Sequence, residues 1–244
     1  MPGPASPASC YLVEADDADG RTWRVLLDLG SGALGALQGL VDPRRVDAVL
    51  LSHLHPDHCL DLCGLYVVER YAPGVAREGR LRVVGPTGVA ERIAAAYGSE
   101  PDGILAAFAF EEWSAGAPVR VGPLTVTPFP AEHPVESYCL RVEAGGRALT
   151  YSGDTDSCPG LVEALRGTDL ALLDAAFVDG RDDVRGIHLT PSRGARACLD
   201  AGGVGRIVLT HLPPWNDPAV VRAQAADVWS GPLDVAQPLA TYDV

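Results

Sequence analysis

The sequence contains no lysine, so its 19 basic residues are all arginine. They are outnumbered by 32 acidic residues, which gives a formal net charge of −13 at pH 7. Proteins that bind nucleic acid broadly do so by neutralising backbone phosphates with basic side chains. The charge therefore argues against a broad nucleic-acid surface, although it leaves room for a small basic pocket.

Long apolar runs and a targeting segment are also missing. No stretch reaches the roughly 18 consecutive apolar residues that a membrane-spanning helix needs. The first residues, Met1-Pro2-Gly3-Pro4, include neither a basic segment nor an apolar core, so we expect no secretory signal. We therefore expect a cytoplasmic protein that does not contact a membrane.

The six cysteines include no Cys-x-x-Cys pair. In a cytoplasmic chain such cysteines are typically reduced and serve packing. Cys59 and Cys63 are four residues apart in a predicted helix, so they share one face of it. We expect them to be buried, with a redox or metal-binding role as the alternative.

No linker, low-complexity run or break in composition divides the 244 residues, so we predict a single domain over residues 1–244. Apolar periodicity predicts strands at 10–14, 23–29, 46–51, 81–85, 170–174 and 205–210, and hairpins over 118–127 and 137–152. It predicts helices at 31–40, 57–70, 87–97, 161–166, 191–201 and 219–229, and a short helix or loop at 101–110. This alternation indicates an α/β fold.

A dense cluster of polar residues follows the apolar run 46–51. Within six residues the chain carries His53, His55, Asp57 and His58. Sites in α/β sheets form at the carboxyl ends of strands, and imidazole and carboxylate groups bind zinc and similar metals. The cluster therefore predicts a metal site, and a polar turn with incidental histidines is the weaker interpretation.

The segment His53-Leu54-His55-Pro56-Asp57-His58 resembles the signature of the metallo-β-lactamase-fold hydrolases. Three further candidates follow in that family's order: His133 in Ala-Glu-His-Pro, Asp154 in Tyr-Ser-Gly-Asp-Thr, and His211 in Leu-Thr-His-Leu-Pro. The resemblance runs from about residue 11 to the C-terminus. It implies a four-layer αββα sandwich. We expect this chain to lack the family's first strand, through a misassigned start or the loss of an edge strand.

The resemblance also implies two divalent metal ions, Zn²⁺ by preference, with Mn²⁺ or Fe²⁺ as alternatives. The implied ligands of the first ion are His53, His55 and His133. Those of the second are Asp57, His58 and His211, and Asp154 bridges the two ions. Asp57 is expected to act in catalysis as well. Such a pair of ions shares a hydroxide and holds both the attacking and the leaving oxygen.

Asp28 lies at the end of a predicted strand, in Leu-Leu-Asp-Leu-Gly. The family has an Asp at this place that hydrogen-bonds a metal-binding histidine. Such a partner fixes the imidazole tautomer. The alternative is an ordinary turn or cap residue.

Asp174-Ala175-Ala176-Phe177 and the later His188-Leu189-Thr190 resemble a paired motif of the family's phosphodiesterase branch, which includes transfer-RNA 3′-processing endonucleases. There a Glu stands where this chain has Asp174 and supports a His at the place of His188. That His contacts the phosphate and protonates the leaving alkoxide, and a carboxylate–imidazole pair suits a general acid. Because Asp is one methylene shorter than Glu, the sequence leaves the pairing distance open. Alternatively, His188 is a cap or surface residue.

Three comparisons of motifs narrow the choice of reaction. No Cys fits the place of Asp154, which disfavours true β-lactamases, and the residues after His133 differ from the run of glyoxalase II-like thioesterases. The segment from Asp154 to His188 is too short for the basic arm of transfer-RNA endonucleases. The chain, including residues 6–13, resembles actinobacterial members linked to cyclic-nucleotide hydrolysis.

We therefore predict a phosphoric diester hydrolase that acts on a small cyclic nucleotide such as cAMP. The family implies a homodimer. The alternatives, in order, are a ribonuclease Z-like endonuclease at RNA 3′ ends, a thioesterase, and a metal-binding module without turnover. The net charge disfavours RNA as a partner.

Overall fold

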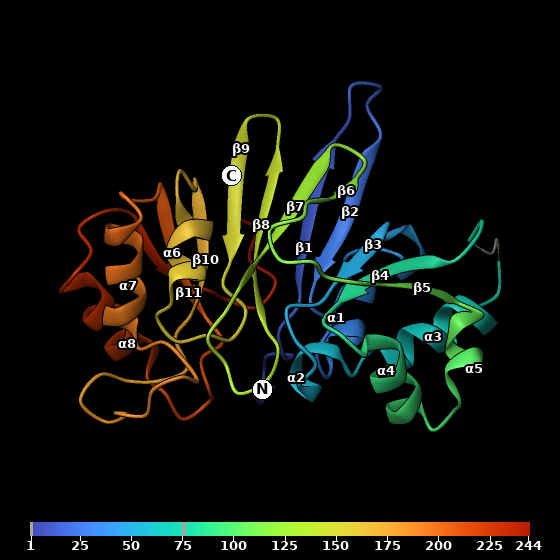
Figure 1. Ribbon diagram of the computed structural model, residues 1–244, viewed down its shortest axis with the longest axis horizontal. Coiled ribbons are helices and arrows are strands. Elements are labelled where there is room, and N and C mark those ends of the chain that lie inside the picture. Colours follow the sequence, from blue (N-terminus) through green and yellow to red (C-terminus); the bar gives the residue numbers. More distant parts are fainter. Residues whose placement is uncertain (1, 75–76) are drawn as a thin grey trace. The chain divides into compact units, whose positions relative to one another are not determined.

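The computed structural model describes residues 2–74 and 77–244 (Figure 1). The chain forms two compact units, which are described separately below. The first consists mainly of residues 6–114 and the second mainly of residues 124–244. The prediction of a single domain over residues 1–244 stays a prediction. Among the described residues, no helix is long and apolar enough to cross a membrane.

The first unit is built on a five-stranded sheet with the strand order β1-β2-β3-β4-β5. Its strands are β1 (Tyr11–Asp16), β2 (Thr22–Leu27), β3 (Ala48–Leu50), β4 (Leu81–Gly85) and β5 (Phe108–Glu112). β1 and β2 are antiparallel, and every later pair is parallel. Every residue of β3 is buried, as expected for a central parallel strand that is covered on both faces.

The helices of this unit are α1 (Ala33–Gln38), the 3₁₀ turn η1 (Pro43–Arg45), α2 (Pro56–Cys59), α3 (Leu62–Tyr71), α4 (Val89–Tyr97) and α5 (Pro101–Leu105). Apolar residues of α1, α3 and α4 join those of the sheet in one buried cluster. Two predictions are corrected here. Residues 57–70 form two helices instead of one. The segment 101–110, predicted as a short helix or loop, contains helix α5 up to Leu105 and then the start of strand β5 at Phe108.

The break between α2 and α3 has an identifiable cause in the backbone hydrogen bonds. In a continuous helix, the His58 carbonyl would accept from residue 62 and the Asp61 N–H would donate to residue 57. Instead, the Leu29 N–H donates to the His58 carbonyl at 2.8 Å, and the Asp61 N–H donates to the Leu29 carbonyl at 3.2 Å. The loop after β2 therefore interrupts the helix and fixes α2.

The seven-stranded sheet has the strand order β12-β11-β10-β9-β8-β7-β6. Its strands are β6 (Val119–Val121), β7 (Leu124–Pro130), β8 (Tyr138–Ala144), β9 (Arg147–Tyr151), β10 (Leu170–Asp174), β11 (Arg206–Thr210) and β12 (Leu233–Val235). β9 to β12 are parallel, whereas β7, β8 and β9 are antiparallel. The three-residue strand β12 was not predicted from the sequence.

The helices of the second unit are α6 (Pro159–Leu165), α7 (Pro191–Asp200) and α8 (Pro218–Ala226). Each begins with a proline, whose fixed φ suits the first helical position. Their apolar faces join the sheet in a second buried cluster. Because β9, β10 and β11 run parallel, their carboxyl ends meet at one edge of the sheet, where polar side chains gather.

Candidate active site

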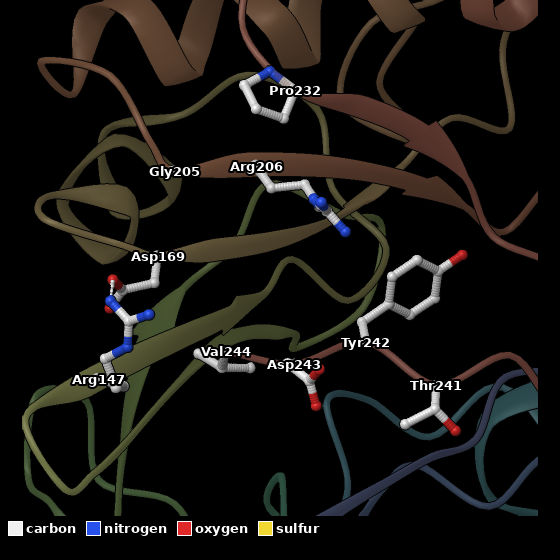
Figure 2. Close-up of a pocket in the computed structure, with 9 residues that line it drawn as sticks. All are labelled: Arg147, Asp169, Gly205, Arg206, Pro232, Thr241, Tyr242, Asp243 and Val244. Carbon is white, nitrogen blue, oxygen red and sulfur yellow. Dashed lines mark hydrogen bonds and ion pairs between the residues drawn. The ribbon is translucent and has the colours of Figure 1, made fainter.

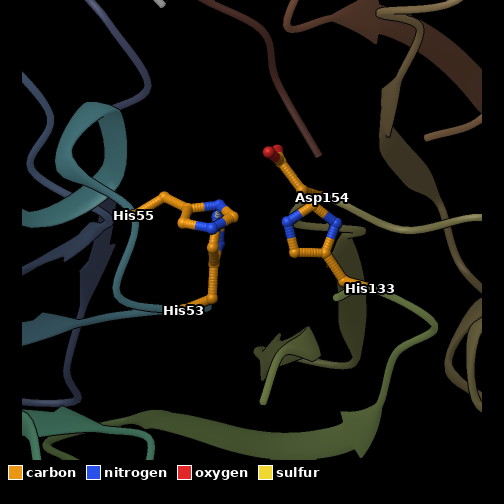
Figure 3. Close-up of side chains that lie close together, drawn as sticks. All are labelled: His53, His55, His133 and Asp154. Carbon is orange, nitrogen blue, oxygen red and sulfur yellow. Dashed lines mark hydrogen bonds between the residues drawn. The ribbon is translucent and has the colours of Figure 1, made fainter. Parts of the chain in front are cut away.

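The first cluster of site residues follows β3 in the first unit. His53 Nε2 lies 3.1 Å from His55 Nδ1, and both rings are drawn in Figure 3. The ring centroids of His53 and His58 are 4.1 Å apart. Asp57 Oδ2 lies 4.0 Å from His58 Nε2. The structure thus brings together the four residues of the predicted metal motif.

Asp28, which is fully buried, organises this cluster. It has a positive φ of 61°, and its Oδ1 accepts a 2.7 Å hydrogen bond from the Ser52 N–H. Its Oδ2 accepts from the Ser52 hydroxyl at 2.8 Å and from His58 Nδ1 at 2.7 Å. The hydrogen bond between Asp28 and a motif histidine, which the resemblance implied, is therefore present.

These contacts determine two imidazole tautomers. His58 Nδ1 donates to a carboxylate, so the lone pair of this ring is on Nε2. The Ser52 hydroxyl proton goes to Asp28, so at 3.1 Å from the Ser52 oxygen His53 Nδ1 is the donor. His53 Nε2 then carries a lone pair as well. A neutral imidazole with such a fixed lone pair is the form that binds a metal ion.

The loop after β2 packs closely against the backbone of the motif. A Cβ added to Gly30 would lie 1.9 Å from the Asp57 carbonyl oxygen, so only glycine fits at this position. The Leu29 N–H bonds the next carbonyl, that of His58. Sequence reasoning missed the role of Gly30, whose only local sign is its place beside Asp28.

The second cluster lies at the carboxyl ends of the parallel strands of the second unit. Each of its four members offers one ligand atom, and these atoms lie within 4.8 Å of one another: Asp154, Asp174, His188 and His211. His211 Nδ1 is 3.5 Å from one oxygen of each Asp. His211 has a positive φ of 58°, a conformation that non-glycine residues adopt rarely and mostly at functional sites.

Asp174 and His188 form the predicted pair. His188 Nδ1 donates to Asp174 Oδ2 at 2.8 Å, so the shorter Asp side chain does reach the imidazole. Burial alone would raise the pKa of Asp174, but the hydrogen bond from His188 and the nearby His211 imidazole hold it below its usual value. Burial alone would lower the pKa of His188, but the Asp174 carboxylate raises it above its ordinary value. The pair favours a protonated imidazole, which is the form that a general acid requires.

His133 lies beside this pair, in the loop between β7 and β8. Its Nδ1 donates to the Ile187 carbonyl at 2.8 Å, so its lone pair is on Nε2. Its ring centroid is 5.5 Å from that of His188. Figure 3 draws His133 together with Asp154, another of the predicted ligands of this unit. The first unit thus supplies four of the seven predicted ligands and the second unit three.

Sequence reasoning missed a further residue of the second unit, Asp156. It is buried, and its carboxylate accepts hydrogen bonds from Arg185, Gly186 and Arg193. These partners are 29 to 37 residues away in the sequence, so no local pattern could have indicated the contacts. The only available sign was a second Asp after Asp154 in Gly-Asp-Thr-Asp.

A separate cavity of about 410 Å³ lies at the opposite edge of the seven-stranded sheet (Figure 2). Arg147 and Arg206, which begin β9 and β11, line it together with the C-terminal residues 241–244. Arg147 forms an ion pair with Asp169 at 2.6 Å. The cavity lies at the amino ends of the strands whose carboxyl ends carry the second cluster, so it does not belong to the candidate site.

Residues 23–212 match the family model described as the beta-lactamase superfamily domain. The chain belongs to this superfamily. Its fold is the α/β metallo-β-lactamase fold, with two mixed sheets flanked by helices, as the sequence motifs predicted. Family membership and the two His/Asp clusters identify the protein as a metal-dependent hydrolase.

Three similarities describe the neighbourhood of this chain within the superfamily. It is 42% identical to the uncharacterized protein ML1173 of Mycobacterium leprae, over 99% of this chain and 84% of the relative. The fold matches the crystal structure of the metallo-β-lactamase-fold protein YhfI from Bacillus subtilis with a TM-score of 0.83. The two sequences are 26% identical, and the match covers 97% of this chain and 92% of YhfI. The chain is also 30% identical to the ribonuclease Z of Methanopyrus kandleri, over 84% of this chain and 82% of the relative.

Proposed function

We propose that the protein hydrolyses phosphodiester bonds of a small cyclic nucleotide such as cAMP and uses two divalent metal ions. The observation that carries this proposal is the Asp174–His188 hydrogen bond of 2.8 Å within a cluster of potential metal ligands. Such a pair suits the protonation of an alkoxide leaving group, which a phosphodiester releases on hydrolysis. The similarity to a ribonuclease Z supports the same bond type.

The residues present fit divalent metal ions. Imidazole and carboxylate groups are the donors that zinc and related ions prefer. The Nδ1 atoms of His53, His58 and His133 each donate to an oxygen, so each of these rings carries its lone pair on Nε2, the atom that would bind a metal ion. By family pattern, His53, His55 and His133 would hold the first ion, Asp57, His58 and His211 would hold the second, and Asp154 would be shared by both. Zn²⁺ remains the preferred ion, with Mn²⁺ or Fe²⁺ as alternatives.

When bound, the ions supply Lewis acidity to the phosphoryl oxygens and lower the pKa of the attacking water. The chain's own residues perform the remaining work. His188, held by Asp174, contacts the phosphate and gives its Nε2 proton to the leaving alkoxide. Asp28, through Ser52 and His58, keeps the motif histidines in their metal-binding tautomers.

A small phosphodiester is favoured over a folded RNA by the net charge of −13, because RNA binding depends on phosphate neutralisation. The alternative is a ribonuclease acting at RNA 3′ ends, which the ribonuclease Z relative supports. A thioesterase and a metal-binding module without turnover follow. A cytoplasmic homodimer remains the expectation for the assembly and its location.

The test compares hydrolysis of cAMP with cleavage of a transfer-RNA precursor, using purified protein reloaded with Zn²⁺ or Mn²⁺. The His53→Ala/His55→Ala double variant is the blank. Turnover of cAMP alone supports the proposal, whereas cleavage of the RNA alone moves the function to the ribonuclease. If neither substrate reacts, thioesters are tested next. Metal retained without hydrolysis of even bis(p-nitrophenyl) phosphate would favour the binding module.

A further inference from the structure

Asp156 lies where three loops of the second unit meet. Its Oδ2 accepts from Arg185 Nε at 2.5 Å and from the Gly186 N–H at 2.9 Å, both in the loop before His188. Its Oδ1 accepts from Arg193 Nη1 at 2.6 Å, in the first turn of α7, and from the Ser157 N–H at 2.7 Å. A single carboxylate therefore ties the loop of Asp154 to the segments on both sides of His188.

Backbone contacts extend this connection to the third loop. The Asp156 N–H donates to the Glu132 carbonyl at 2.8 Å, and the Glu132 N–H donates to the Thr155 hydroxyl at 3.0 Å. Glu132 directly precedes His133, whose ring in turn donates to the Ile187 carbonyl. The contacts close a ring through the three loops that carry His133, Asp154 and His188.

The burial and the partners of Asp156 are those of a residue with a fixed position, and they differ from those of a surface ion pair. The residue is only 2% exposed, and its carboxylate faces two guanidinium groups. Hydrogen bonds between a carboxylate and guanidinium groups are charge-assisted, so those of Asp156 with Arg185 and Arg193 are strong and directional.

We propose that Asp156 is a positioning residue that fixes His188 relative to Asp154. This inference rests on the proposed role of His188 in phosphodiester hydrolysis. Gly186, whose N–H donates to the Asp156 carboxylate, lies two residues before His188. A displacement of about 1 Å at a reacting group can lower a rate by about 10²-fold, so the anchor matters for rate. The hydrogen bonds of the Asp156 carboxylate go to Ser157, Arg185, Gly186 and Arg193, and not to the predicted ligands His133 and His211.

The test is a double-mutant cycle with bis(p-nitrophenyl) phosphate, whose good leaving group keeps the rate of His188→Ala measurable. In the wild-type background, we expect Asp156→Asn to lower kcat measurably but by no more than His188→Ala does with the same substrate, with KM and metal content nearly unchanged. In the His188→Ala background the same change should cost less than about twofold, because its effect acts through His188. An equal loss in both backgrounds would overturn the proposal.

Two further variants make the result interpretable. Arg185→Ala removes one hydrogen-bond partner of Asp156. Because the Arg185 side chain is 64% exposed, this variant tests the same connection with little risk to folding. It should lower kcat in the same background-dependent way. Asp182→Asn is the matched control, because Asp182 lies on the same loop but bonds Arg181 and Val178. It should leave kcat within about twofold, and a loss equal to that of Asp156→Asn would contradict the proposal.

A measurement without turnover separates this inference from the proposed function. Hydrogen exchange of the backbone amides in residues 185–188 should be about 10-fold faster in Asp156→Ala than in the wild type, because alanine removes both carboxylate oxygens and with them the acceptor of the Gly186 N–H. If no phosphodiester is hydrolysed but exchange in this segment is faster in the variant, the proposed function is wrong and the positioning role of Asp156 is supported. If exchange in the segment is unchanged, the anchor itself is refuted.

Discussion

Asp28→Asn changes one atom of a buried carboxylate that accepts three hydrogen bonds. The amide has only one oxygen, so its NH₂ group must face either the Ser52 N–H or the side chains of Ser52 and His58. In the first orientation two donors meet at a 2.7 Å contact. In the second, His58 Nδ1 can no longer donate and must become the acceptor, which moves the ring proton to Nε2.

Both orientations have a measurable cost. A buried donor without an acceptor costs about 1–3 kcal/mol of the free energy of unfolding. For a chain of this length, that corresponds to a fall in the melting temperature of roughly 2–12 °C for the metal-free protein. Loss of a partner that orients a metal-binding histidine typically weakens metal affinity ~10–100-fold, or ~1.4–2.8 kcal/mol.

The assay is competition of the reloaded protein with a chelator of known affinity, followed by thermal unfolding of the metal-free form. Asp61→Asn is the matched control, because the Asp61 carboxylate lies near the motif and accepts from a backbone group, the Leu34 N–H, at 2.8 Å. It should keep the metal affinity of the wild type. Unchanged affinity in Asp28→Asn would refute the reasoning that Asp28 sets the His58 tautomer.

Three other changes have defined outcomes. Asp154→Ala should lose both metal ions and all hydrolysis, because in the proposed arrangement both ions would share its carboxylate, and elemental analysis that still found two ions would contradict this role. His188→Ala should keep the metal but lower kcat for cAMP by the ~10²–10⁴-fold typical of a general acid, and release of metal instead would show that His188 is a ligand. Gly30→Ala should cost ~1–3 kcal/mol of stability and weaken metal binding, because its Cβ would lie 1.9 Å from the Asp57 carbonyl oxygen, and wild-type behaviour in thermal unfolding would refute the close fit.

The elements that the sequence predicts correctly are those whose signal is local. The buried strand β3 lies within the apolar run 46–51, and the parallel strands β10 and β11 within similar runs. The break after α2 could not be predicted, because it depends on hydrogen bonds with Leu29, a residue far back in the chain. Strand β12 has only three residues, too few for a periodic pattern.

The same distinction applies to the candidate site. The motif around His53 is visible because its ligands share one turn. The distance between Asp174 and His188 depends on how the loop from residue 175 to 190 folds back, and the sequence left it open until the structure gave 2.8 Å. The role of Asp156 could not be predicted, because the distant partners of its carboxylate come from that loop and from α7.

The most direct test of the central claim is cAMP hydrolysis by the metal-free protein during stepwise addition of Zn²⁺ or Mn²⁺. The two clusters predict that the rate rises until two ions are bound per chain and falls when a chelator removes them. The His53→Ala/His55→Ala variant should stay inactive throughout the titration. No hydrolysis of cAMP at any metal loading, or hydrolysis that persists after the metal is removed, would contradict the account.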